Sequence, residues 1–214
     1  MKVKVDLHVH TCYSYDGLIK PEELVFYAKK AGLNGVAITD HDRIDAALKM
    51  ARETIDFLII PGIEVSSLNG HIIGLNLREA VPKNLSMEET VDKIHEFGGL
   101  AVACHPEAVL KASLGQKTSR KFDAVEVVNA SALPFKRSVE KAREIAKRLG
   151  LPQIAGSDAH YAPEIGKAHT LIEAELSCDE VIKAIRKGLC EPLGNAIPLG
   201  TRLKREFLAL KARI

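Results

Sequence analysis

The stretch K-V-K-V-D-L-H-V-H, residues 2–10, decides how the rest of the chain is interpreted. Its apolar and polar residues alternate, which is typical of a β-strand whose successive side chains point to opposite faces. His8 and His10 therefore lie on the same face as Asp6, at the end of the strand. A His-x-His pair alone is weak evidence and favours a packed core pair. Its meaning depends on what the other strands carry at their ends.

Short β-branched runs alternate with longer helical patterns along the whole chain. We expect strands over residues 3–8, 35–39, 57–60, 71–75, 100–104, 124–128, 153–156 and 170–172. We expect helices over residues 21–30, 45–54, 86–97, 135–149 and 178–187. Strands that alternate with helices imply parallel β-α units. No Pro/Gly/Ser-rich linker or internal repeat interrupts the series, so the sequence predicts a single domain.

Two topologies fit such units, an open doubly wound sheet and a closed β/α barrel. An open sheet that binds nucleotides usually has a Gly-rich turn after its first strand, and the sequence contains neither Gly-x-Gly-x-x-Gly nor a Walker lysine loop. Polar side chains of ligand type instead follow most of the expected strands. Convergence of side chains from many strand ends is typical of the catalytic face of a TIM-like barrel. The sequence therefore favours the α/β barrel.

The composition excludes several classes of protein. The 214 residues are 46% hydrophobic and 27% charged, enough for one well-filled core. A net charge of +2 gives no electrostatic case for a nucleic-acid coat or a polybasic membrane anchor. The apolar runs are too short to span a bilayer, and the start of the chain has no signal-peptide pattern. Four scattered cysteines, without a Cys-x-x-Cys pair, predict a reduced cytoplasmic protein.

Nine side chains of ligand type stand at strand ends or in the turns that follow. They are His8, His10, Asp16, His41, Glu64, His71, His105, Asp158 and His160. Imidazole together with carboxylate suits zinc, manganese or iron. Nine ligands are too many for one ion, so we expect a bridged pair or a trinuclear cluster, an arrangement that clamps a phosphoryl group and activates water. Glu64, an acid among histidines, is the natural bridge between ions.

The order of these motifs resembles that of the polymerase and histidinol phosphatase (PHP) superfamily. The motifs are His8-x-His10, Asp16-Gly17, Thr39-Asp40-His41, Gly62-Ile63-Glu64, His71, His105-Pro106 and Ser157-Asp158-Ala159-His160. The resemblance runs from residue 6 to about residue 190 and includes a segment similar to the PHP-associated C-terminal module. It implies a distorted seven-stranded TIM-like barrel, (β/α)7, over residues 1–195. Residues 196–214 would then form an amphipathic basic helix that packs on the barrel or on a partner subunit.

The resemblance also implies a ligand set for each of two to three divalent ions (Zn, Mn or Fe). His8, His10, Glu64 and Asp158 would hold the first ion, Glu64, His71 and His105 the second, and Asp16, His41 and His160 the third. Within this set, Glu64, Asp158, His41 and His160 would carry the catalytic roles. Little room exists between His105 and Asp158 for the insertion that shapes substrate choice in some members of the family.

Cationic side chains near the predicted site are candidates for binding the substrate. They are Arg43, Lys111, Lys117 and Arg120, with Lys121 in the same basic segment. Arg43 lies two residues after His41, and a guanidinium binds phosphate bidentately. The segment 111–121 follows His105 and should leave the barrel at the metal face, although such runs are usually solvated surfaces.

A few other polar residues complete the interpretation. His95 and His169 are interpreted as surface or packing histidines. Asp6, Asp40 and Asn129 are candidates for orienting the ligand imidazoles, with ordinary strand-end hydrogen bonding as the alternative.

The function that these observations favour is a metal-dependent phosphoesterase. It would hydrolyse a phosphate ester of a small metabolite, nucleotide or oligonucleotide by a metal-bridging hydroxide. We expect a phosphorylated small molecule or nucleotide as the substrate, nucleic acid as a less favoured one, no membrane partner, and room for a homo-oligomer.

Two other classes stay open. An amidohydrolase also begins with His-x-His, but it would not need Asp16, Glu64 and the Asp158-x-His160 pair. A non-catalytic, nucleic-acid-binding or polymerase-associated barrel would not keep a complete set of buried ligands without metal.

Overall fold

The computed structural model describes residues 1–109 and 111–212. Leu110, Arg213 and Ile214 lie outside the described residues, and the last two belong to the expected C-terminal tail. The strands are β1 (Lys2–Val9), β2 (Gly35–Ile38), β3 (Leu58–Ser67), β4 (Gly70–Leu75), β5 (Leu100–Ala103), β6 (Ala124–Asn129), β7 (Gln153–Gly156), β8 (Ala168–Glu173) and β9 (Cys190–Gly194). The helices are α1 (Pro21–Lys30), α2 (Asp45–Glu53), α3 (Met87–Glu96), α4 (Phe135–Leu149), α5 (Cys178–Arg186) and α6 (Leu199–Ala212).

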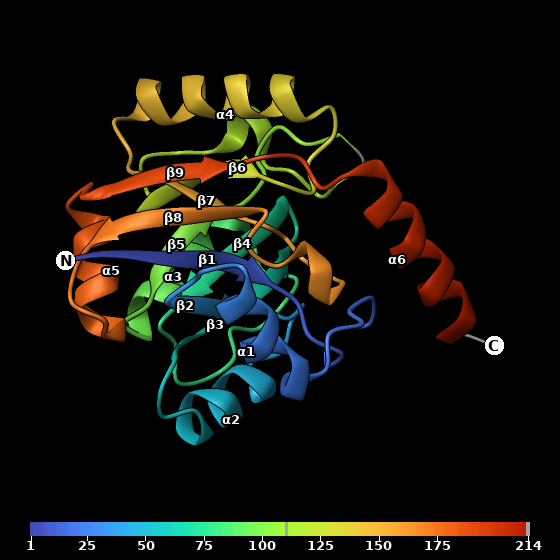
Figure 1. The fold of residues 1–214 in the computed structure, drawn as a ribbon. Helices are drawn as coiled ribbons and strands as arrows, with labels where there is room; N and C mark the ends of the chain where they lie inside the picture. The colour runs from blue at the N-terminus through green and yellow to red at the C-terminus, as the bar shows by residue number, and fades with distance from the viewer. Residues whose placement is uncertain (110, 213–214) are drawn as a thin grey trace.

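The strands form one sheet that curls into a nearly closed barrel, with helices on its outer surface (Figure 1). The strand order is β7-β6-β5-β4-β3-β2-β1-β8-β9. The chain beyond β7 returns to the end of β1, where His10 N donates to Ala159 O at 2.9 Å and Asp158 N donates to His8 O at 2.8 Å. The barrel predicted from the strand-end pattern is therefore confirmed.

The sheet is mixed: it contains the parallel β-α units that the sequence predicts together with antiparallel pairs. β1, β2 and β3 pair in parallel, as do β5, β6 and β7, whereas β4 is antiparallel to both β3 and β5. Only residues 68–69 separate β3 from β4, and so short a turn permits only antiparallel pairing. β8 and β9 add an antiparallel hairpin beside β1. The described residues thus hold nine strands, and β9 is the one that the sequence pattern did not predict.

Local sequence signals account for where several helices begin and end. Ser86 caps α3: Glu89 N donates to Ser86 Oγ at 3.2 Å, and Ser86 N donates to Glu89 Oε2 at 2.9 Å. This reciprocal pair is the capping box that the Ser-x-x-Glu pattern predicts. α1 begins at Pro21, whose fixed φ and missing N–H suit the first helical position. α4 ends at Gly150, which adopts a left-handed conformation with φ 69°.

The interior of the barrel is apolar, and one of its ends is closed. Val5 and Leu7 of β1 and Ile60 of β3 are fully buried there. Val181 and Ile185 of α5 pack into the same cluster, so α5 closes the end at which the parallel strands begin. The opposite end, where the parallel strands finish, carries the polar side chains described below.

The C-terminal helix α6 stands beside the open end of the barrel (Figure 1). Its barrel contacts include Arg202 and Arg205, whereas the apolar Leu203 and Phe207 are 61% and 56% exposed in the single chain. Among the described residues, no helix is both long enough and apolar enough to cross a membrane.

Candidate metal centre

All nine ligand-type side chains predicted from the sequence converge at the open end of the barrel. They are held by different strands: His8 and His10 by β1, His41 by the end of β2, Glu64 by β3, His71 by β4, His105 by the end of β5, and Asp158 and His160 by the segment after β7, while Asp16 lies in the loop after β1. Each is buried except Asp16 and His71, which are partly exposed. The fold therefore assembles in space what the sequence spreads over some 150 residues.

Glu64 lies at the centre of this arrangement. Five imidazoles lie within 3.4 Å of its carboxylate: His8, His10, His41, His71 and His105, at 3.4, 3.2, 3.3, 3.0 and 2.9 Å. The Oε2 atom faces His8, His10 and His41, and the Oε1 atom faces His71 and His105. One carboxylate thus joins two groups of imidazoles, as the sequence-based interpretation of Glu64 as a bridge requires.

Asp158 and Asp16 organise the remaining ligand-type side chains. Asp158 Oδ1 lies 3.7 Å from His8 Nε2 and 3.5 Å from His10 Nε2. Asp16 Oδ2 lies 3.2 Å from His160 Nε2 and 3.6 Å from His41 Nε2. Asp158 thus adds a second carboxylate beside His8 and His10, and Asp16 adds one beside His41 and His160.

The donor set fits divalent transition-metal ions. Three buried atoms of the cluster have no hydrogen-bond partner among the residues that the structure describes: Asp16 Oδ1, His41 Nδ1 and His105 Nδ1. The Nε2 atoms of His8 and His10 face each other at 3.0 Å. Nitrogens that bind one ion at about 2.0–2.1 Å lie roughly 3.0–3.4 Å apart, so this spacing suits two ligands of the same cation. Unpaired buried polar atoms are costly, and ligation would satisfy them.

The electrostatics of the cluster keep its carboxylates ionised. Burial opposes ionisation of Glu64, but the charges of His8 and His41 outweigh it and hold its pKa well below the ordinary value. For Asp158, Lys111 and His8 likewise overcome the effect of burial and lower its pKa. Burial lowers the pKa of His105, which favours the neutral imidazole that a metal requires.

Glu126 and Asn129 of β6 hold several ligands in place. Glu126 Oε1 lies 3.0 Å from His8 Nδ1, and Glu126 Oε2 accepts from His105 N at 2.8 Å. Asn129 Nδ2 donates to Asp158 Oδ2 at 3.1 Å and to Glu126 Oε2 at 2.9 Å. Ligating histidines commonly need such an outer partner. Asn129 was expected to orient an imidazole, but its side chain instead donates to the carboxylates of Asp158 and Glu126. Glu126 was missed, although an acid inside an otherwise apolar strand signals a buried partner.

The two other residues expected to orient imidazoles act differently. Asp40 accepts from Ser14 Oγ at 3.1 Å, and Ser14 Oγ lies 3.1 Å from His10 Nδ1, so Asp40 reaches this imidazole through the serine. Asp6 instead accepts from backbone N–H groups, those of Ser157 and Gly166 at 2.8 Å each. Burial raises the pKa of Asp6 to about 6 against the effect of these hydrogen bonds.

Cys104 is a further buried neighbour that the sequence did not single out. Its Sγ atom donates to Glu64 Oε1 at 3.4 Å, and burial raises the pKa of the thiol well above the ordinary value. The thiol thus supports the Glu64 carboxylate. No spacing signal distinguishes Cys104 from the other scattered cysteines.

Backbone strain and close approach mark the same end of the barrel. His105 and Asp158 have positive φ angles of 30° and 54°, a region that residues other than glycine adopt at a cost of about 1–3 kcal/mol. Gly156 lies against His8, and a Cβ atom at this position would overlap that of His8. β7 can therefore approach β1 closely only because residue 156 is a glycine.

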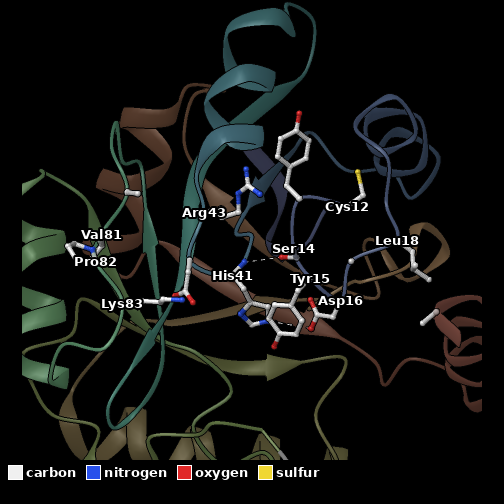
Figure 2. A pocket seen from close by; sticks show the side chains of 15 residues that line it. Cys12, Ser14, Tyr15, Asp16, Leu18, His41, Arg43, Val81, Pro82 and Lys83 are labelled. Carbon is white, nitrogen blue, oxygen red and sulfur yellow. Dashed lines mark hydrogen bonds and ion pairs between the residues drawn. The ribbon is translucent and has the colours of Figure 1, made fainter. Parts of the chain in front are cut away.

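Two cavities open beside the ligands. The larger, of about 840 Å³, is lined by Tyr13, Tyr15, Asp16, His41, Arg43 and Lys83 among others (Figure 2). Tyr15 lies against His41, with ring centroids 5.0 Å apart. The smaller, of about 270 Å³, is lined by Asp16, Lys111, Ser131, His160, Arg205 and Glu206, and Ala209 of α6 reaches both cavities.

The predicted substrate-binding cations divide into two groups. Arg43 lines the larger cavity, and Lys111, which lines the smaller one, forms an ion pair with Asp158. Lys117 and Arg120 are exposed and lie outside the linings of both cavities as far as the chain is described. Lys121, their neighbour, pairs with Asp92 of α3. The basic segment therefore turns away from the ligands after Lys111. Lys83, which the sequence did not indicate, lines the larger cavity instead.

The other histidines lie elsewhere. His95 Nε2 pairs with Asp123 Oδ2 at 2.8 Å near the closed end of the barrel, and His169 lies on β8 outside the ligand groups. Their interpretation as surface or packing residues matches these positions.

Comparison with known proteins gives the family context. The family described as PHP-associated matches residues 136–190. An uncharacterised protein of Methanocaldococcus jannaschii is 40% identical over 141 residues, which are 60% of this chain and 82% of that protein. The 5′-3′ exoribonuclease Rnm of Salmonella typhimurium is 44% identical over 86 residues, which are 36% of this chain and 29% of that protein.

The fold itself is also shared with a solved structure. A two-domain protein from Bacteroides vulgatus, containing a predicted PHP-like metal-dependent phosphoesterase, superimposes with a TM-score of 0.74 at 18% identity. The match covers 98% of this chain and 70% of that one. Together with the nine converging ligands and the mixed barrel, these relationships show that the chain belongs to the PHP superfamily.

Proposed function

We propose that this protein is a metal-dependent phosphoesterase that hydrolyses a phosphate ester of a small metabolite, a nucleotide or an oligonucleotide end. Membership of the PHP superfamily and the set of imidazole and carboxylate donors both support a metal-dependent hydrolase. The observation that carries the proposal is the contact of one buried carboxylate, Glu64, with five imidazoles. A site for a single ion would not need five imidazoles around one carboxylate. A cluster of ions would, and such clusters suit phosphoryl transfer.

Three sets of residues would hold the ions. His8, His10, Glu64 and Asp158 would form the first set, Glu64, His71 and His105 the second, and Asp16, His41 and His160 the third. When bound, divalent ions there would supply Lewis-acid activation of water and of the phosphoryl oxygens.

The protein's own side chains would position the substrate. Arg43 and Lys83 line the larger cavity next to His41 and would attract an anionic substrate. Tyr15 is 77% exposed and presents a flat surface there, against which a ring of the substrate could lie. Lys111 reaches the ligands from the other side and pairs with Asp158. No covalent nucleophile is required from these residues, because water is the attacking group in a hydrolysis.

A nucleic-acid end is the substrate that one specific observation favours within this class. The 5′-3′ exoribonuclease Rnm of Salmonella typhimurium shares 44% identity with this chain over 86 residues. The larger cavity, about 840 Å³, has room for a nucleotide.

The test is hydrolysis by the purified protein loaded with Zn²⁺, Mn²⁺ or Fe²⁺. We would compare nucleoside monophosphates, 5′-phosphorylated oligoribonucleotides and an amide panel, with Glu64→Ala as the inactive control. Release of phosphate or nucleotide by the loaded wild-type protein alone is the expected result. Hydrolysis of amides but not of phosphate esters would establish the amidohydrolase alternative. Oligonucleotide binding without turnover, by a protein of full metal content, would establish the non-catalytic one.

A further inference from the structure

Two arginines of the C-terminal helix α6 contact two loops of the metal centre, through hydrogen bonds and an ion pair. Arg202 and Arg205 lie about one turn apart and both bond to the barrel, whereas Lys204 between them is exposed. Neither arginine belongs to a ligand motif. Because Leu203 and Phe207 are largely exposed, these polar contacts are a main attachment of the helix.

Arg205 reaches the loop that carries His160. Its Nη1 atom lies 3.3 Å from Glu164 Oε1 and 3.4 Å from Glu164 Oε2. Glu164 is completely buried, and its Oε2 atom accepts from His160 N at 3.0 Å and from Tyr161 N at 3.2 Å. The guanidinium therefore balances the carboxylate that fixes the backbone of His160. Without Arg205, Glu164 would be a buried charge lacking its cationic partner, which is strongly unfavourable.

Arg202 reaches the loop that orients Asp158. It donates to three carbonyl oxygens, those of Ala130 at 2.8 Å, Ser131 at 2.9 Å and Ile197 at 3.0 Å. Ser131 N donates to Asn129 Oδ1 at 3.0 Å, and Asn129 Nδ2 donates to Asp158 Oδ2. Arg202 thus holds the loop next to Asn129, the residue that donates to the predicted ligand Asp158.

We propose that α6 positions the metal ligands, and that Arg205 is the positioning residue for His160, acting through Glu164. This inference rests on the metal centre of the proposed function, and it assigns a role to a helix that lies outside every ligand motif. It predicts that the ion held by Asp16, His41 and His160 depends on Arg205, because His160 is the ligand that Arg205 orients. Arg202 serves the same purpose for Asp158.

The test measures metal affinity rather than activity. Zn²⁺ or Mn²⁺ is titrated into metal-free protein in competition with a chromophoric chelator. Arg205→Ala should weaken the binding of one ion, the one assigned to Asp16, His41 and His160, by roughly 10–100-fold, the usual effect of losing a partner that orients a ligand. Arg205→Lys keeps the positive charge but loses the planar guanidinium that contacts both oxygens of Glu164, and it should give an intermediate affinity. Lys204→Ala, on the exposed side of the same helix, is the matched control and should bind like the wild type.

A purely structural role of Arg205 would give a different pattern. It would lower the melting temperature of metal-free Arg205→Ala but leave its ion stoichiometry and affinities unchanged, and that result would overturn the proposal. If Arg205→Ala does not fold by circular dichroism, Arg205→Lys decides, because wild-type affinity in this variant would equally overturn it. Failure of the wild-type protein to hydrolyse phosphate esters would refute the proposed function, yet the titration would still test the role of α6.

Discussion

The two ends of the barrel use the same chemical pair, imidazole with carboxylate, to different effect. At the closed end, His95 of α3 pairs with Asp123 at 2.8 Å; the two side chains are 35% and 20% exposed. Ala101 N donates to the same oxygen of Asp123, so the backbone also uses that carboxylate. At the open end, Glu64 is buried and contacts five imidazoles, and three polar atoms of the cluster accept or donate no hydrogen bond within the described part of the chain.

The difference shows what separates a structural pair from a binding site. An isolated pair satisfies itself with protein groups and water, and its residues need nothing else. A cluster of buried donors cannot be satisfied by the protein alone, because imidazoles packed around one carboxylate leave ring nitrogens without partners. The number of converging groups and their unsatisfied atoms, rather than the presence of histidine, mark the functional end.

The largest contrast between the two ends should come from removing a central residue of each. Glu64→Ala should lower ion content and reduce hydrolysis by more than roughly 100-fold, since five imidazoles lose their common partner. His95→Ala should keep both properties near the wild-type values. Metal analysis after gel filtration and steady-state kinetics on the same preparations measure the effects. An equal loss of ion content and hydrolysis in the two variants would show that the two ends of the barrel do not differ in this way.

A smaller effect is expected from the carboxylates that support histidines without belonging to the ligand groups. Glu126→Gln keeps the size of the side chain but loses the charge beside His8, and should weaken metal affinity by roughly 10–100-fold. Asp123→Asn makes the same change beside His95 and should leave affinity unaltered. Competition with a chelator compares the two variants. An Asp123→Asn protein with the weaker affinity would contradict our assignment of Glu126.

The smallest effect concerns stability at the closed end. The His95–Asp123 pair is partly exposed, so solvent screens it and His95→Ala should cost no more than about 1 kcal/mol, or roughly 2–4 °C in melting temperature. Thermal unfolding of metal-free protein followed by circular dichroism measures this. A loss of 10 °C would show that this pair is a major structural contact, which its exposure argues against.

Much of the site could be predicted because its residues stand next to strong local signals. His41, His105 and Asp158 each follow a short strand, His8 lies near the end of β1, and strand ends of a barrel share one face. The direction of β4 was not predicted, because the period of a strand says nothing about its pairing partner. β8 and β9 form a hairpin across an intervening helix, and no turn signal links two strands so separated in the chain.

The residues that were missed act over longer distances. Glu126 and Cys104 stand inside apolar runs, where only the three-dimensional neighbours reveal a role. Lys117 and Arg120 follow a ligand in sequence, but the chain turns away between Lys111 and β6. Proximity in sequence to a ligand was therefore a poor guide to proximity in space. Arg205 is distant in sequence from the loops that carry the ligands, and it reaches the site only because α6 folds back toward them.

The barrel closes where β1 meets the segment that follows β7, and few backbone hydrogen bonds hold this closure. Backbone bonds there join residues 8–10 to residues 158–159, and the ligands lie on both sides, with His8 and His10 on one strand and Asp158 across the closure. A cation shared by His8 and Asp158 would cross-link β1 to the segment that follows β7 and close the chain between them into a loop, as a disulfide does in a secreted protein. Opening of the barrel there would then have to await release of the ion, so metal content would set how long the folded chain survives exposure to a protease.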